Sequence, residues 1–312
     1  MNIVFMGTPD FSVPCLKAII EAGHNVSAVF TQPDKPKNRG HKMMFTPVKE
    51  CAVQNDIPVY QPLSLRKGED AESSMNTLKE LNPDCIVVVA YGQILPKSIL
   101  ELPQYGCINV HASLLPRYRG AAPIQRCIID GEKETGVTTM YMAEGLDTGD
   151  MILAEKLAID EKMTASELHD RLSEMGARLI VETLRQVEEG TAPRTPQTDE
   201  NTCYASMLTK EMCRIDFNKS LETVYNHIRG LSSSPCAFTT LGDKRLKVYF
   251  AEKTDMKSDL PCGTAADDSF GIVCADGVIR FTDIQLEGGK RMNASDFLRG
   301  RKVEKGTVFG EQ

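Results

Sequence analysis

Two polar side chains at the end of an apolar, strand-like run are the first candidates for chemistry in this sequence. Asn109 and His111 close the segment GCINVH at residues 106–111, and a turn-rich loop containing Pro116 follows as far as Gly120. Side chains two residues apart on a strand point to the same face. An amide that donates hydrogen bonds and an imidazole that transfers protons near neutral pH would therefore share one pocket.

The alternatives for these residues are ordinary structural roles. A single histidine at a strand end more often makes a structural hydrogen bond, although His111 alone among five histidines follows a buried-type strand into a stiffened loop. An acidic partner, Asp147, lies in the turn GLDTGD at residues 145–150. The same turn also suits a simple connection between strands, because Asp and Gly favour turns for local reasons. The residues alone leave both interpretations open.

The elements that must position these side chains follow an alternating pattern. Strands are predicted at 2–6, 25–31, 57–60, 85–90 and 106–111, with helices at 11–23, 47–54 and 70–81 between them. This order predicts an α/β fold with a doubly wound, mostly parallel, Rossmann-like sheet. Ligands bind beyond the carboxyl ends of the strands in such sheets, and residues 91–96 and 109–120 begin there.

The rest of the chain divides into the end of this domain, a linker and a second domain. A helix is predicted at 122–130, strands at 136–143 and 151–159, and a long helix at 164–189 whose Thr164 and Glu167 form a capping box. A Pro- and Thr-rich stretch then predicts a linker. A helix at 219–231 and strands at 236–241, 246–254, 269–275, 277–286 and 306–309 follow. We therefore predict domains at 1–189 and 206–312, joined by 190–205, the second being a small, OB-like β-barrel.

Composition and absent motifs exclude several classes of protein. The 312 residues carry a formal net charge of −7 and ten scattered cysteines without a C-x-x-C pair, which predicts reduced thiols in the cytoplasm and no metal site. No apolar run is long enough to cross a membrane, and no signal peptide is expected. The turn at Gly7 lacks G-x-G-x-x-G and no P-loop is present, so a nicotinamide or nucleotide cofactor is unsupported. Gly7 either makes a tight turn or lines the pocket.

The motifs resemble those of the folate-dependent formyltransferases. The matching features are Asn109-x-His111, SLLPxYRG at 113–120 and Asp147-Thr148-Gly149, in the family's order and spacing. The resemblance implies 10-formyltetrahydrofolate as co-substrate, with Asn109, His111 and Asp147 as catalytic residues. Asn109 would stabilise the oxyanion, His111 would stabilise it or move protons, and Asp147 would orient His111, hold its charge or steer protons. The implied folate-binding residues are Tyr91, Gly92, Gln93, Ile94, Leu95, Ser113, Leu114, Leu115 and Pro116.

The acceptor of the formyl group rests on other parts of the chain. The opening GTPDF, the loop at 31–45 and the β-rich second domain resemble family members that formylate initiator methionyl-tRNA. The resemblance implies that Arg39 and Lys42 bind tRNA, although Asn38 replaces a usual Gly, and it implies a monomeric enzyme of translation initiation. Two alternatives are a formyltransferase for a small amine, such as an amino sugar or glycinamide ribonucleotide, and a nucleic-acid-binding protein with an inactive catalytic domain. The loop and second domain count against the first, and the intact Asn109, His111 and Asp147 against the second.

Overall fold

The computed structural model describes residues 1–37 and 42–310 and divides them into two compact units. Unit 1 consists of residues 1–120, 135–157 and 169–204, and unit 2 of residues 121–134, 158–168 and 205–312. The units interleave along the sequence, because the helix at 123–129 groups with the C-terminal residues. The predicted domain limits at 189 and 206 stay a prediction about which parts fold independently.

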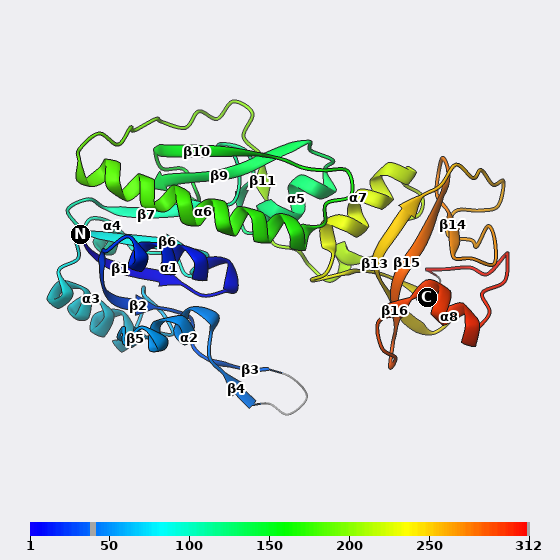
Figure 1. Ribbon diagram of the computed structural model, residues 1–312, viewed down its shortest axis with the longest axis horizontal. Coiled ribbons are helices and arrows are strands. Elements are labelled where there is room, and N and C mark those ends of the chain that lie inside the picture. Colours follow the sequence, from blue (N-terminus) through cyan, green and yellow to red (C-terminus); the bar gives the residue numbers. More distant parts are fainter. Residues whose placement is uncertain (38–41, 311–312) are drawn as a thin grey trace. The chain divides into compact units, whose positions relative to one another are not determined.

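A seven-stranded sheet forms the centre of unit 1, in the order β10-β9-β7-β6-β1-β2-β5 (Figure 1). Its strands are β1 (Asn2–Gly7), β2 (Asn25–Phe30), β5 (Val59–Tyr60), β6 (Cys85–Val89), β7 (Cys107–His111), β9 (Glu134–Tyr141) and β10 (Met151–Ala158). Neighbouring strands from β5 to β7 are parallel, whereas β9 is antiparallel to β7. The predicted doubly wound, mostly parallel sheet is confirmed.

Helices cover both faces of this sheet because its strands are apolar on both sides. The helices are α1 (Val13–Glu21), α2 (Pro47–Gln54), α3 (Glu69–Leu81), α4 (Lys97–Leu100) and α6 (Ala165–Glu188), with a 3-10 turn, η1, at Asp10–Ser12. On one face Gly176 of α6 lies against Cys15 of α1 and Val110 of β7. On the other face the core includes Leu78 of α3 and Ile99 of α4.

The long helix α6 begins as the sequence predicts. The backbone N–H of Thr164 donates to Glu167 Oε2 at 2.8 Å, and the N–H of Glu167 donates back to Thr164 Oγ1 at 3.3 Å. This reciprocal pair satisfies two backbone donors that the first helical turn leaves free. Among the described residues, no helix is long and apolar enough to cross a membrane.

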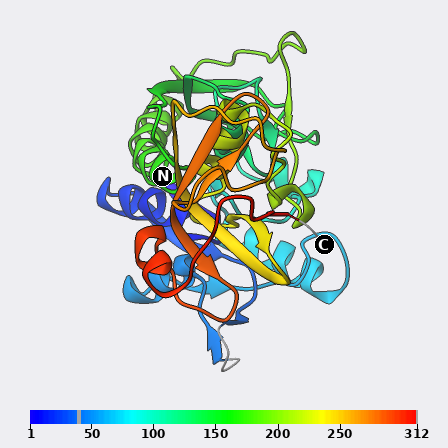
Figure 2. The same ribbon diagram turned by 90° about the vertical axis from the view of Figure 1, so that its right-hand side faces the viewer.

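Unit 2 is built on an antiparallel sheet in the order β12-β13-β15-β14, with β16 paired to β15. Its elements are α5 (Pro123–Ile129), α7 (Leu221–Leu231), β12 (Ala237–Leu241), β13 (Lys244–Lys253), β14 (Gly271–Val273), β15 (Val278–Leu286), β16 (Met292–Asn293) and α8 (Ala294–Gly300). Its core includes Phe217, Phe270, Phe281 and Phe309. The yellow and orange strands of this unit face the viewer in Figure 2.

Isolated bridges close the sheet of unit 2 into a small barrel. Leu241 of β12 bridges Phe309, Val308 bridges Thr264, and Ala265 bridges Ile272 of β14. The predicted small β-barrel is therefore confirmed, but the predicted strand at 306–309 is present only as these bridges. The backbone of Gly306 is left-handed, at φ +93°, and its N–H donates to the Ala265 carbonyl oxygen at 2.9 Å.

Candidate active site

Three strands of the parallel sheet end where the strand order reverses. From β1 the sheet continues to β2 and β5 on one side and to β6 and β7 on the other. Carboxyl ends at such a reversal are where ligands bind in open α/β sheets. Gly7 ends β1, Val89 ends β6 and His111 ends β7, so the candidate site lies at this edge.

Gly7 permits close packing at this edge. A Cβ at Gly7 would lie 2.7 Å from the Phe5 ring and 3.0 Å from the Val89 carbonyl oxygen. Nearby, the Ser12 hydroxyl donates to that same Val89 oxygen at 2.6 Å. Close packing of β1 against the end of β6 therefore explains the glycine.

Asn109 and His111 lie on the same face of β7, as their spacing predicts. This face also carries Cys107, whose Sγ lies 3.6 Å from the Ile99 carbonyl oxygen in α4. Asn109 is 9 % exposed and pairs in register with Met140 of β9. Within residues 1–37 and 42–310 no hydrogen bond to the Asn109 amide is found, so this polar group is available to a ligand.

Each nitrogen of the His111 ring faces an oxygen atom of a neighbouring residue. Nε2 lies 2.9 Å from the Tyr118 carbonyl oxygen, and Nδ1 lies 3.7 Å from Asp147 Oδ2. A carbonyl oxygen only accepts hydrogen bonds, so Nε2 carries a proton. Nδ1 faces the Asp147 carboxylate, which would stabilise a positive charge on the ring. The structure thus brings His111 and Asp147 together.

Thr138 of β9 holds the loop that follows His111. The Thr138 hydroxyl donates to the Ser113 carbonyl oxygen at 2.7 Å and accepts from the Leu115 N–H at 3.2 Å. The Ser113 hydroxyl donates to the Arg117 carbonyl oxygen at 2.7 Å. These bonds fix the predicted folate-binding residues Ser113–Pro116 at the end of β7.

The turn that carries Asp147 has an uncommon backbone conformation. Asp147 adopts a left-handed φ of +52°, which side chains other than Gly seldom adopt. Its Oδ2 accepts from the Gly120 N–H at 2.8 Å. A Cβ at Gly149 would lie 1.7 Å from the Tyr141 carbonyl oxygen, so only glycine fits there. The Asp147-Thr148-Gly149 turn is therefore more closely constrained than a simple connection between strands.

Replacing Gly149 by alanine should displace this turn. The clash with backbone is expected to lower the free energy of unfolding by about 1–3 kcal/mol and to reduce kcat. Urea unfolding and steady-state rates would measure the two effects. Gly300→Ala is the matched control, because a Cβ at Gly300 meets nothing within 4 Å. Equal stability and rate for both variants would contradict the constraint.

The side chains of the loop at 91–95 differ in how far they are buried and in whether they are already hydrogen-bonded. Tyr91 and Leu95 belong to the core beneath α3 and α4, and burial raises the pKa of the Tyr91 hydroxyl. The Gln93 side chain accepts from the Leu65 N–H at 2.9 Å and donates to the Pro62 carbonyl oxygen at 2.8 Å. Ile94 is 65 % exposed. Of the predicted folate-binding residues in this loop, Ile94 and the backbone are thus the parts open to a ligand.

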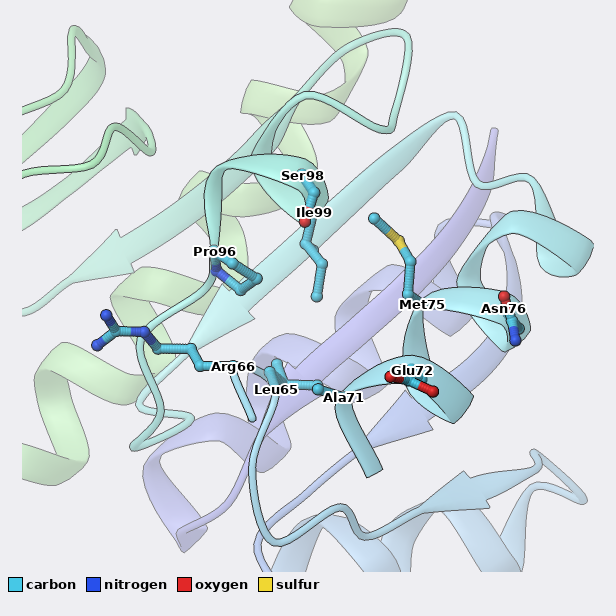
Figure 3. Close-up of a pocket in the computed structure, with 9 residues that line it drawn as sticks. All are labelled: Leu65, Arg66, Ala71, Glu72, Met75, Asn76, Pro96, Ser98 and Ile99. Carbon is cyan, nitrogen blue, oxygen red and sulfur yellow. The ribbon is translucent and has the colours of Figure 1, made fainter. Parts of the chain in front are cut away.

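A pocket of about 400 Å³ lies elsewhere in unit 1, beside α3 and α4 (Figure 3). Its lining combines apolar and polar side chains: Leu65, Arg66, Ala71, Glu72, Met75, Asn76, Pro96, Ser98 and Ile99. None of the predicted catalytic or folate-binding residues lines it. In the described part of the chain, no group of three or more His, Cys, Asp or Glu residues could hold a metal ion.

The predicted tRNA-binding loop is carried by a short hairpin, β3 (Lys35–Lys37) and β4 (Lys42–Met44), which the sequence did not predict. Arg39 lies outside the described residues, and Lys42 begins β4. Near the base of the hairpin, Lys49 Nζ lies 2.5 Å from Asp34 Oδ2. Burial acts to raise the pKa of Asp34, but hydrogen bonds from Lys49 and Gln61 hold this pKa below its usual value. The side chains of Met43 and Phe45 are exposed.

Comparisons with known proteins place this chain in a family. Residues 1–184 match the formyl transferase family, and residues 207–302 match the formyl transferase C-terminal domain. The chain belongs to the formyl transferase family.

Individual relatives match along nearly the whole chain. It is 50 % identical to a methionyl-tRNA formyltransferase of Clostridioides difficile, over 99 % of this chain and 100 % of the relative. It is 49 % identical to one of Geobacter metallireducens, over 99 % of both chains.

Solved structures share the fold at low sequence identity. HypX of Aquifex aeolicus in complex with tetrahydrofolic acid has a TM-score of 0.66 and 17 % identity, covering 96 % of this chain and 47 % of HypX. An N-formyltransferase of Helicobacter canadensis has a TM-score of 0.66 and 19 % identity, covering 93 % of this chain and 99 % of that one.

Proposed function

We propose that this protein transfers the formyl group of 10-formyltetrahydrofolate to the α-amino group of initiator methionyl-tRNA. The product, N-formylmethionyl-tRNA, serves translation initiation. The observation that carries the proposal is near-full-length identity of about 50 % to methionyl-tRNA formyltransferases, across both family domains. The Asn109 amide, which has no hydrogen-bond partner in the described part of the chain, lies on the same strand face as His111 of the His111–Asp147 pair and supports it.

The reaction exchanges one C–N bond for another. The lone pair of the methionyl amine attacks the formyl carbon, and the carbonyl π electrons move to oxygen to give a tetrahedral oxyanion. The oxyanion then re-forms the carbonyl as the bond from carbon to folate N10 breaks. One proton leaves the attacking amine and one reaches N10, so tetrahydrofolate and the formylated amine result. No metal or oxidant is needed for this balance.

Each of the three side chains has a role in this sequence. The Asn109 amide donates to the oxyanion, since its N–H groups have no other hydrogen-bond partner among the described residues. His111 takes the amine proton at Nδ1, because Nε2 is committed to the Tyr118 carbonyl oxygen. Asp147, 3.7 Å from that nitrogen, stabilises the imidazolium until the proton passes to N10.

The folate would bind between two loops at the carboxyl ends of β6 and β7. The fixed backbone of Ser113–Pro116 and the loop Tyr91–Leu95 supply the surface. Backbone groups are the natural contacts for a pterin ring here, since the Ser113, Tyr91 and Gln93 side chains are buried or already hydrogen-bonded.

The tRNA would be bound by the hairpin loop, with Arg39 and Lys42 contacting phosphate, and by unit 2. A local group of cations is enough for phosphate binding even in an acidic chain. We further propose that the protein acts as a monomer in the cytoplasm, where its ten free cysteines stay reduced.

The direct test follows formyl transfer from 10-formyltetrahydrofolate with two acceptors in parallel. Charged initiator tRNA should yield N-formylmethionyl-tRNA, and dTDP-amino sugars or glycinamide ribonucleotide should not react. Product with the small amines alone would identify a different acceptor. Folate binding without any formyl product would indicate an inactive catalytic domain.

Arg39→Ala should raise KM for the charged tRNA more than KM for the folate. Loss of one phosphate contact also lowers the salt dependence of tRNA binding by about one unit of slope. Steady-state rates at several salt concentrations measure both effects. Lys17→Ala, in α1, serves as the charge-matched control. Equal changes in both KM values would contradict the assignment of Arg39.

A further inference from the structure

Residues 195–203, within the predicted linker, pack against the candidate active site of unit 1. Thr195 and Met151 exchange two backbone hydrogen bonds of 2.9 Å. Cys203 accepts from the Tyr118 N–H at its Sγ, at 3.2 Å, and from the Arg119 N–H at its carbonyl oxygen, at 3.0 Å. The segment therefore contacts both the loop after His111 and the strand after the Asp147 turn.

Gln197 is the residue of this segment that contacts the Asp147 turn directly. Its side-chain Nε2 donates to the carbonyl oxygens of Asp147 and Gly149, both at 2.8 Å. The same nitrogen lies 3.9 Å from the Met140 sulfur, and Met140 is the register partner of Asn109. The Gln197 amide thus links two carbonyl oxygens of the turn that carries the Asp147 carboxylate.

Arg119 fixes the orientation of that amide. Its side chain is 3 % exposed, and Nε donates to Gln197 Oε1 at 2.9 Å. Because the oxygen faces a donor and the nitrogen faces two acceptors, the amide fits in one orientation only. Glutamate would keep the contact with Arg119 but has no hydrogen to offer the two carbonyl oxygens.

The Asp147 turn needs contacts from neighbouring residues to keep its conformation. Asp147 is held in a left-handed backbone conformation, which persists only when surrounding contacts determine it. Its carboxylate accepts a hydrogen bond from the Gly120 N–H and faces His111 Nδ1. A small rotation of the turn would therefore move the carboxylate away from the imidazole.

We infer that Gln197 is a positioning residue for formyl transfer, which holds the Asp147 turn so that the carboxylate faces His111. The inference rests on the catalytic role proposed above for Asp147. It assigns an active-site function to a residue in the predicted linker. Gln197 acts through Asp147 and needs no contact with folate or with the amine.

The test is a double-mutant cycle between Gln197 and Asp147. Gln197→Ala and Gln197→Glu should each lower kcat by about 10- to 30-fold, with both KM values changed by less than about twofold. In an Asp147→Ala background the same substitutions should change kcat by less than about twofold, since the positioned group is gone. Thr198→Ala, an exposed neighbour, is the matched control and should leave kcat unchanged.

The possible outcomes separate the inference from the function on which it rests. An equal loss of rate in both backgrounds would overturn the inference, because Gln197 would then act on the fold in general. A wild-type rate for Gln197→Glu would also overturn it, since that variant removes both donors while keeping the side-chain size. A wild-type rate for Asp147→Ala alone would overturn the proposed role of Asp147 and this inference with it. Formyl transfer by the unsubstituted protein is measured separately, so failure of the acceptor assignment remains distinguishable.

Discussion

Asn109→Ala should lower kcat by about 10²–10³-fold, the usual loss when an oxyanion donor is removed. The KM for folate should change little, because the amide contributes mainly after the amine has attacked. The free energy of unfolding should stay within about 1 kcal/mol, since the Asn109 amide makes no hydrogen bond among the described residues. Single-turnover formylation with saturating folate measures the chemical step.

Two further variants make this prediction specific. Asn109→Asp keeps the shape but replaces the N–H donor with an acceptor, so it should be at least as slow as the alanine variant. Asn76→Ala removes an exposed amide on α3 and should leave the rate unchanged. A rate near that of the unsubstituted protein for Asn109→Asp would remove the amide from the mechanism.

The second large effect is expected at His111. His111→Ala should lower kcat by about 10²–10⁴-fold, the range for a lost general acid–base. It should also cost about 1–3 kcal/mol of stability, because the hydrogen bond between the His111 ring and the Tyr118 carbonyl oxygen is lost. The decisive measurement is kcat from single-turnover formylation at saturating folate and charged tRNA.

His111→Gln separates catalysis from stability. Glutamine can still donate to the Tyr118 carbonyl oxygen, so this variant should unfold at nearly the original denaturant concentration. Its amide cannot accept the amine proton as a general base does, so its kcat should be as low as that of His111→Ala. A kcat near that of the unsubstituted protein in His111→Gln would show that another group carries the proton.

The sequence predicted the regular parts of unit 1 closely because their signals are local. The β-branched run of β6 and the capping box of α6 each lie within a few consecutive residues. The shared face of Asn109 and His111 follows from the two-residue period of a strand. Short elements were harder to predict from the sequence. Helix α8 spans only seven residues, fewer than two helical turns, so its sequence shows no helical periodicity of apolar residues.

The contacts that complete the site are non-local, and composition concealed some of them. Asp147 lies 36 positions after His111, so the residues alone left open whether it is an acidic partner or part of a simple turn, and the family resemblance implied its catalytic role. Gln197 lies among Pro and Thr residues that are typical of linkers, although its side chain binds the turn of Asp147. The burial of the Tyr91 side chain was equally hidden, because a tyrosine after a strand suits a pocket as well as a core.

The closed barrel of unit 2 has a consequence for solubility. Edge strands with free N–H and C=O groups pair readily with other chains, which leads to aggregation. The bridges at Leu241–Phe309 and Ala265–Ile272 engage the free sides of β12 and β14, the two ends of that sheet. Phe309 therefore covers the edge of β12, whereas Ala265 covers that of β14, so proteolytic removal of residues 306–310 would expose the β12 edge to intermolecular β-pairing.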